Sequence, residues 1–183
     1  MKIDKSWTLF LDRDGVINRK IDGDYVRNLN QFEWLPGIHD SIRQLSLVFG
    51  KIIIVTNQQG VGKGLMTHEE VNTIHEHIKN LVAEKGGKID AIYYAPELKS
   101  ENSDLRKPNI GMAHLAKNDF PGIDFLKSIM VGDTMSDMQF GKKAGMITVF
   151  ITNVKLPPES LNLIDLHFED VAAFAVYIQN PGS

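Results

Sequence analysis

The feature that most constrains the fold of this chain is a regular alternation of short apolar runs with amphipathic helical stripes. Runs rich in β-branched and aromatic residues predict buried strands, whereas apolar residues spaced by three and four predict helices that bury one face. We expect strands at residues 7–11, 51–55, 89–94, 126–131 and 146–151, with a short edge strand at 165–168. Helices are expected at 38–49, after the capping box that Thr67 forms with Glu70, at 110–116, up to 144 and at 171–178.

This alternation predicts an α/β protein with a parallel sheet and right-handed crossovers. Such a chain forms a Rossmann-like doubly wound sheet with helices on both faces. The run at 51–55 contains four consecutive β-branched residues, which is typical of a strand covered on both faces. The length of 183 residues suits one core, and no repeat or linker divides the sequence, so we expect a single domain over 1–183.

Composition narrows the possible partners and compartments. With 20 basic and 23 acidic residues the net charge is −3, so a nucleic-acid partner is not expected. No cysteine is present, which excludes disulfides, thiolate nucleophiles and cysteine-bound zinc. The N-terminus lacks the apolar segment of a signal peptide, and the longest aliphatic run, 52–55, is too short to span a bilayer. We expect a soluble cytoplasmic protein, monomeric by default, without a membrane partner.

Polar clusters follow three of the predicted strands. Asp12 and Asp14 follow the first strand, and the pair Thr56 and Asn57 follows the second. The fourth strand leads into a loop and helix that carry Asp133 and Asp137, while the charged loop at 95–108 carries Lys107. Because the carboxyl ends of parallel strands meet at one edge of the sheet, we expect these groups to form one site.

Several carboxylates in one cleft require a cation. Two unit charges in close contact repel by about 4 kcal/mol at an effective dielectric constant near 20. Oxygen ligands without neighbouring histidine or cysteine favour Mg²⁺, which binds through carboxylates and a substrate phosphate. A lysine beside such a centre suits a phosphoryl group, whose negative charge it stabilises. The residues therefore predict a site for magnesium and phosphate.

Four sequence motifs resemble those of the haloacid dehalogenase (HAD) superfamily, in the same order. They are Asp-Arg-Asp-Gly-Val-Ile-Asn at 12–18, Val-Thr-Asn-Gln-Gln-Gly at 55–60, Arg-Lys-Pro at 106–108 and Val-Gly-Asp-Thr-Met-Ser-Asp at 131–137. Within that superfamily the sequence is similar to the histidinol-phosphate phosphatase and D-glycero-D-manno-heptose-1,7-bisphosphate phosphatase group. The resemblance implies a HAD fold without a large cap domain and a Mg²⁺-dependent phosphomonoesterase that acts through an aspartyl phosphate.

The resemblance also implies roles for the acidic residues. Asp12 would be the nucleophile, and Asp14 would protonate the leaving group and later activate water. Mg²⁺ would be held by the Asp12 and Asp133 carboxylates and the backbone carbonyl of Asp14. Asp137 would support the metal or the lysine from behind.

The remaining roles that the resemblance implies belong to groups that bind the substrate. Thr56, Asn57 and Lys107 would bind the transferring phosphoryl group. Arg106 would meet the remote part of the substrate, and Lys63 stands near a position where relatives of the heptose type carry arginine.

Two departures from this group affect the cofactor and the substrate. Zinc-bearing members carry a Cys-x-His and Cys-x-Cys loop before the Arg-Lys-Pro motif, where this chain offers Ala95, Glu97, Ser103 and Leu105, so no zinc is expected. Thr134 stands where heptose-type relatives usually have lysine. We expect a small phosphate ester as substrate, a heptose 1,7-bisphosphate rather than histidinol phosphate. A noncatalytic phosphate-binding or regulatory protein is the alternative of another class, and a nucleic-acid end phosphatase is disfavoured by the acidic balance.

Two further features lie outside the motifs. Residues 19–35 show no sustained period and are expected to form a loop or flap over the mouth of the site. His75 and His77 fall on different faces of a predicted helix and are expected to be solvated, whereas His114 suits a packed core position.

Overall fold

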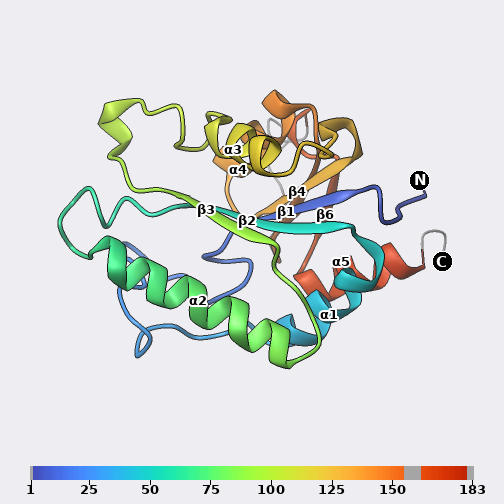
Figure 1. Ribbon diagram of the computed structural model, residues 1–183, viewed down its shortest axis with the longest axis horizontal. Helices are drawn as coiled ribbons and strands as arrows, with labels where there is room; N and C mark the ends of the chain where they lie inside the picture. The colour runs from blue at the N-terminus through green and yellow to red at the C-terminus, as the bar shows by residue number, and fades with distance from the viewer. Residues whose placement is uncertain (1, 155–161, 181–183) are drawn as a thin grey trace.

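A single parallel sheet forms the centre of the computed structural model, which describes residues 2–154 and 162–180 (Figure 1). Within those ranges the strand order is β3-β2-β1-β4-β5-β6, with every neighbouring pair parallel. The strands are β1 (Thr8–Leu11), β2 (Lys51–Asn57), β3 (Ala91–Ala95), β4 (Ser128–Gly132), β5 (Ile147–Ile151) and β6 (Leu166–Phe168). The predicted Rossmann-like, doubly wound arrangement is confirmed.

Helices cover both faces of the sheet (Figure 1). One face carries α1 (Ile38–Val48), α2 (His68–Glu84) and α5 (Val171–Gln179), and the other carries α3 (Gly111–Asp119) and α4 (Met135–Ala144). Short 3₁₀ turns occur at Lys99–Glu101 and Phe125–Lys127. Side-chain alternation along β1 explains the two layers, because Leu9 and Leu11 enter one apolar core whereas Phe10 enters the other.

The central position of β1 places the chain after it at the middle of the sheet edge. β1 lies between β2 and β4, and all four of its residues are buried. Immediately after the strand, the Asp12 amide donates to the Val131 carbonyl at 2.9 Å. Strand β2 extends to residue 57, two residues beyond the expected end, because Thr56 and Asn57 still pair with β3. The apolar run ends at residue 55, but the ladder does not.

Helix α2 begins as the sequence predicts. The Thr67 hydroxyl accepts from the Glu70 amide at 3.1 Å, and the Glu70 carboxylate accepts from the Thr67 amide at 2.7 Å. This reciprocal pair is a capping box, which satisfies two backbone donors at the start of the helix.

The expectations for the histidines are wrong in two cases. His75 is buried, because its ring faces the buried Arg13 guanidinium, a partner that helical periodicity does not reveal. His114 is exposed on α3, because the apolar stripe of that helix runs along other positions. His77 is only half-buried, with its ring edge-on to Phe32.

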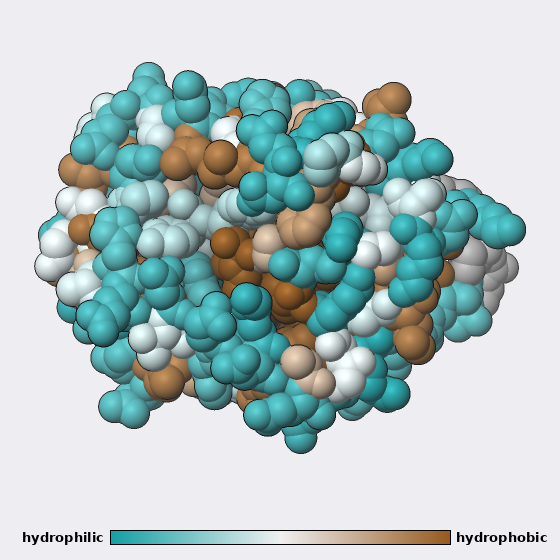
Figure 2. All heavy atoms as spheres, in the orientation of Figure 1, coloured by the Kyte–Doolittle hydropathy of each residue, from teal (hydrophilic) through white to brown (hydrophobic). Residues whose placement is uncertain are grey.

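The surface in view in Figure 2 is mostly hydrophilic, with hydrophobic residues in a central hollow and in scattered single positions. Large apolar side chains that are exposed, such as Leu47, Leu126 and Val176, come from different elements, as is normal for a globular protein. None of the helices in the described ranges is both long and apolar enough to cross a membrane.

Candidate active site

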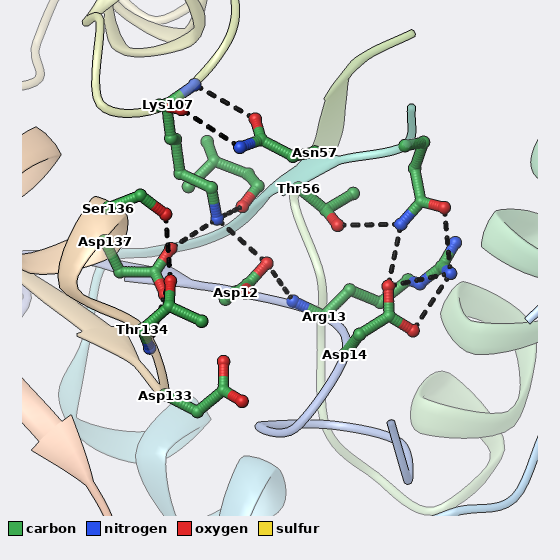
Figure 3. Close-up of polar contacts among 12 residues, drawn as sticks. Asp12, Arg13, Asp14, Thr56, Asn57, Lys107, Asp133, Thr134, Ser136 and Asp137 are labelled. Atoms are coloured by element: carbon green, nitrogen blue, oxygen red, sulfur yellow. Dashed lines mark hydrogen bonds and ion pairs between the residues drawn. The ribbon is translucent and has the colours of Figure 1, made fainter. Parts of the chain in front are cut away.

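Three carboxylates converge at the centre of the sheet edge (Figure 3). Asp12 follows β1, Asp133 follows β4, and Asp137 lies in the first turn of α4. One oxygen from each side chain lies within 4.8 Å of the others. The strand ends thus bring together the acidic groups that the sequence places more than a hundred residues apart.

A buried lysine joins two of these carboxylates. The Lys107 side chain reaches in from the 95–108 loop and is 1% exposed. Its Nζ lies 2.9 Å from Asp12 Oδ1 and 2.6 Å from Asp137 Oδ1, and it donates to the Val55 carbonyl at 2.7 Å. Burial disfavours the charged ammonium, but the carboxylates of Asp12 and Asp137 outweigh it and raise the pKa of Lys107 above its ordinary value. Lys107 is therefore a permanent cation beside Asp12.

Lys107 does not fully compensate the negative charge of the three carboxylates. Burial, with the charges of Asp137 and Asp133, raises the pKa of Asp12 to about 7, although Lys107 opposes the shift. Burial likewise raises the pKa of Asp133 above its ordinary value, with Lys20 opposing. Asp133 Oδ1 is buried and has no hydrogen-bond partner among the described residues. A bound cation would stabilise the charged form of both carboxylates and give the unpartnered Asp133 oxygen a ligand. The carboxylates of Asp12 and Asp133 therefore fit a Mg²⁺ site.

Asp137 is already engaged on both of its oxygens. Its Oδ2 accepts from the Thr134 amide at 3.0 Å and from the Thr134 hydroxyl at 2.6 Å, while Oδ1 faces Lys107. This arrangement suits a residue that orients Lys107 from behind. Thr134, which departs from the heptose-type pattern, is the N-cap residue of α4 and binds Asp137 through both its amide and its hydroxyl group.

Asp14 lies in a separate hydrogen-bond network (Figure 3). Its Oδ1 accepts from Asn18 Nδ2 at 2.8 Å, its Oδ2 accepts from Gln58 Nε2 at 2.8 Å, and Arg13 donates to both oxygens at 3.0 Å. Burial raises the pKa of Asp14, but the Arg13 charge and these hydrogen bonds outweigh it and hold the pKa below its usual value. Asp14 is therefore ionised here and able to accept a proton.

After Asp14 the backbone turns at Gly15, where it passes close to the Asp133 side chain. Gly15 adopts φ +90°, and a Cβ added there would lie 2.3 Å from Asp133 Oδ2. Only glycine fits both the left-handed backbone and the contact with the acidic centre.

Thr56 and Asn57 line the same pocket but use their polar groups differently. Asn57 Nδ2 donates to the Lys107 carbonyl at 3.1 Å, and the Lys107 amide donates to Asn57 Oδ1 at 3.0 Å. The Asn57 side chain thus fixes the lysine backbone. The Thr56 hydroxyl accepts from Gln58 Nε2 at 2.9 Å, which leaves its own proton free to donate.

The pocket above these groups has a volume of about 240 Å³. Arg106 lines both this pocket and a neighbouring one of about 390 Å³. Lys63 is not among the lining residues, and its Nζ lies 5.2 Å from the ring centre of Tyr25, which does line the pocket. The residues of the first pocket are Asp12, Asp14, Lys20, Ile21, Asp24, Tyr25, Val26, Thr56, Asn57, Arg106, Lys107, Thr134 and Ser136.

The sequence did not single out Lys20 or Tyr25. Both come from the 19–35 segment, which contributes five residues between positions 20 and 26 to the lining of the pocket. Lys20 Nζ lies 3.1 Å from Asp133 Oδ2, a partner 113 positions away. The segment has no period that would indicate which side chains turn inward, so only the flap itself was predictable.

The sequence of this chain is also similar to the sequences of known phosphatases. Residues 9–168 match the family model described as Polynucleotide kinase 3 phosphatase. A D-glycero-alpha-D-manno-heptose-1,7-bisphosphate 7-phosphatase of Mycobacterium tuberculosis is 39% identical over 173 residues, which cover 94% of this chain and 91% of the relative. This chain belongs to that phosphatase family, within the HAD heptose-bisphosphate phosphatase group.

Other members of the group extend the likeness. The D-glycero-beta-D-manno-heptose-1,7-bisphosphate 7-phosphatase of Escherichia coli K12 is 35% identical over 86% of this chain and 85% of the relative. The crystal structure of a D,D-heptose 1,7-bisphosphate phosphatase from B. bronchiseptica, complexed with magnesium and phosphate, superposes with a TM-score of 0.83 at 27% identity and covers all of both chains. Like these heptose-bisphosphate phosphatases, the chain is a phosphoric monoester hydrolase.

Proposed function

We propose that this protein is a Mg²⁺-dependent phosphatase that removes the 7-phosphate of a heptose 1,7-bisphosphate through an aspartyl phosphate on Asp12. The observation that carries the proposal is the contact of Asp12 with the buried Lys107, both of which line the pocket. The Asp133 carboxylate lies close to Asp12, outside that lining. A carboxylate, a fixed cation and a divalent-metal site are the parts that phosphoryl transfer needs.

The carboxylates of Asp12 and Asp133, together with the backbone carbonyl of Asp14, would hold Mg²⁺. When bound there, the ion would supply positive charge that neutralises the oxygens of a phosphoryl group beside Asp12. Lys107 adds a second charge on the same side, and the Thr56 hydroxyl donates a hydrogen bond to the phosphoryl oxygens. Asn57 keeps Lys107 in place through its two contacts with the lysine backbone.

The reaction then proceeds in two displacements. An Asp12 oxygen attacks phosphorus, the bond from phosphorus to the sugar oxygen breaks, and Asp14 gives its proton to that oxygen. Asp14 next takes a proton from water, whose oxygen attacks the phosphorus of the aspartyl phosphate and releases Asp12 and inorganic phosphate. The incoming phosphate carries negative charge, which raises the pKa of Asp14 and favours the protonated form needed for the first step.

Cations around the pocket favour a substrate with a second phosphate. Arg106 lines the wall between two adjoining pockets, and Lys20 lies on the flap. Lys63 stands beside Tyr25, outside the lining, where it stabilises the position of the ring. Histidinol phosphate carries an amine that these cations would repel, so we favour the heptose bisphosphate.

Phosphate release from a panel of substrates tests the proposal. The panel contains heptose 1,7-bisphosphate, histidinol phosphate, p-nitrophenyl phosphate and an oligonucleotide with a 3′-phosphate, each with Mg²⁺ and with EDTA. We expect hydrolysis of the heptose bisphosphate with the highest kcat/KM, loss of activity in EDTA, and a decrease of about a thousandfold or more in Asp12→Asn. Asp40→Asn, at an exposed position of α1, should leave the rates unchanged.

The outcomes separate the alternatives. Retained activity in Asp12→Asn would contradict the mechanism. A preference for histidinol phosphate or for the oligonucleotide would overturn the choice of substrate. Turnover of none of the compounds by folded protein would favour a noncatalytic phosphate-binding role.

A further inference from the structure

A fully buried arginine connects the acid–base residue to helix α2. Arg13, between the two aspartates of the first motif, has no exposed side-chain surface. Its Nη2 donates to both Asp14 oxygens at 3.0 Å and to Gln58 Oε1 at 3.1 Å. Its Nη1 lies 3.3 Å from Nε2 of His75, which belongs to α2. The guanidinium is thus held at both ends, by the site and by the helix.

The chemistry of this contact fixes the state of His75. Since an arginine guanidinium carries only donors, His75 Nε2 accepts the hydrogen bond, and the ring proton sits on Nδ1. Burial, reinforced by the Arg13 charge, lowers the pKa of His75 to about 3, so the imidazole is neutral at every physiological pH. Tyr94 packs edge-on against the ring, with the centroids 5.4 Å apart. His75 is a neutral acceptor in a fixed orientation.

A neutral acceptor is the group that this position requires. A carboxylate in place of His75 would compete with Asp14 for the guanidinium, and a cation would repel it. An apolar side chain would leave Nη1 buried without its partner, and Arg13 would then reorient to find another. Only a neutral acceptor leaves the charge of Arg13 directed at Asp14.

Gln58 completes the frame around the Asp14 carboxylate. Its Oε1 accepts from Arg13, while its Nε2 donates to Asp14 Oδ2 and to the Thr56 hydroxyl, at 2.8 and 2.9 Å. The amide orientation is therefore set by Arg13, and through it by His75. The direction of Asp14 depends on a chain of contacts that starts on α2.

We propose that His75 is a positioning residue for the acid–base step, which it serves by fixing Arg13 and hence the direction of the Asp14 carboxyl group. The proposal rests on the function proposed above, in which Asp14 protonates the leaving group. His75 touches neither substrate nor metal in this scheme. Its effect should therefore be greatest where the leaving group needs the proton from Asp14.

Substrates with different leaving groups test this role. An alkoxide leaves only with a proton from Asp14, whereas p-nitrophenolate leaves readily without one, and kcat/KM covers the steps through the first phosphoryl transfer. In His75→Leu we expect kcat/KM for heptose 1,7-bisphosphate to fall about tenfold and that for p-nitrophenyl phosphate to change by about twofold or less. His75→Gln, whose carbonyl can accept from Arg13, should restore the wild-type ratio.

Matched variants interpret the result. His77→Gln, on the same helix but packed against Phe32, should keep the wild-type ratio, and Asp14→Asn should show a larger discrimination of the same kind. Equal losses on both substrates in His75→Leu, or no loss on either, would overturn the proposal. If His75→Leu does not fold, His75→Asn, too short to reach Arg13, decides by the same ratio.

Failure of the proposed function looks different from failure of this inference. It would appear as no hydrolysis by the wild-type protein, or as no leaving-group discrimination in Asp14→Asn. If the wild-type protein hydrolyses both compounds and Asp14→Asn loses more activity on the heptose bisphosphate than on p-nitrophenyl phosphate, the proposed function stands. The result for His75→Leu then tests the role of His75 alone.

Discussion

At the scale of single residues, the site is a balance of buried charges held in fixed directions. Lys107 compensates part of the charge of Asp12 and Asp137, and its contacts with both are within 3 Å. Removing one partner of a buried ion pair costs about 3–5 kcal/mol, because the other charge is left in a medium of low polarity. An exposed pair such as Lys79 with Glu76 contributes far less. Charges in the site therefore affect stability as well as chemistry.

Gly15→Ala should damage activity more than stability. The φ of +90° penalises any Cβ by about 1–2 kcal/mol, and the added methyl would lie 2.3 Å from Asp133 Oδ2, so the Asp133 carboxylate must move. A shift of about 1 Å in a reacting group lowers rates by about a hundredfold. We therefore expect kcat/KM to fall about a hundredfold and Mg²⁺ to bind more weakly. Urea denaturation of the same variant measures the change in stability.

Gly64→Ala is the matched control for this prediction. Gly64 has φ +68°, and a Cβ there would meet nothing within 4 Å. The two variants share the backbone penalty of about 1–2 kcal/mol, but Gly64→Ala should keep its activity. A comparable loss of activity in both would mean that backbone strain alone, and not the contact with Asp133, causes the effect.

At the scale of elements, the sequence predicts the helices, the strands and the edge where they deliver polar groups. Within the described residues, strands β1–β6 and helices α1–α5 each coincide with a local pattern, although the two short 3₁₀ helices do not. The topology of a doubly wound sheet then brings Asp12 and Asp133 together, and Lys107 joins them from the 95–108 loop. What local patterns do not contain is the partner of each side chain. The Asn57 side chain hydrogen-bonds to the backbone of Lys107, which is 50 residues away in the sequence. His75 contacts the buried guanidinium of Arg13, which is 62 residues away.

The capping box of α2 allows a test at this scale. Thr67→Ala removes the hydroxyl that accepts from the Glu70 amide and leaves that donor without its partner. We expect the free energy of unfolding to fall by about 1 kcal/mol, measured by urea denaturation, while kcat/KM is unchanged. Activity should persist because the cap lies two turns of helix before His75.

Thr73→Ala on the same helix is the control that distinguishes loss of the cap from the general effect on stability of replacing a threonine by alanine. Its hydroxyl only donates to the Glu69 carbonyl, four residues before it, in an exposed position. Alanine is the better helix former, so this variant should be as stable as the wild type or more stable. A loss equal to that of Thr67→Ala would contradict the importance of the cap.

At the scale of the whole molecule, the acidic centre should couple stability to pH. Burial raises the pKa of Asp12 from an ordinary 3.8 to about 7, so between these values the folded protein keeps a proton that the unfolded chain has lost. Without metal, this group therefore makes the fold less stable as pH rises through that window, and its penalty is complete above pH 7. The lowered pKa of Asp14 acts in the opposite direction, at lower pH.

Magnesium should reverse this dependence, because the ion binds only the deprotonated carboxylate. Affinity for Mg²⁺ should fall about tenfold for each pH unit below the pKa of Asp12, and binding at pH 6 should release a proton. At about 100 times the Kd, the ion stabilises the fold by about 2.7 kcal/mol. Thermal melting with Mg²⁺ and with EDTA should accordingly show a larger gain at pH 8 than at pH 5.

Calorimetry in buffers of different ionisation enthalpy measures the released proton directly. Asp12→Asn cannot supply that proton, so its Mg²⁺ binding, though weaker, should lose most of its pH dependence near neutrality. Asp133, whose pKa is also raised by burial, would contribute whatever dependence remains. If Mg²⁺ raised the melting temperature equally at pH 5 and pH 8 in the wild type, the elevated pKa of Asp12 could not be what opposes the metal, and the coupling between charge and fold would have to lie elsewhere.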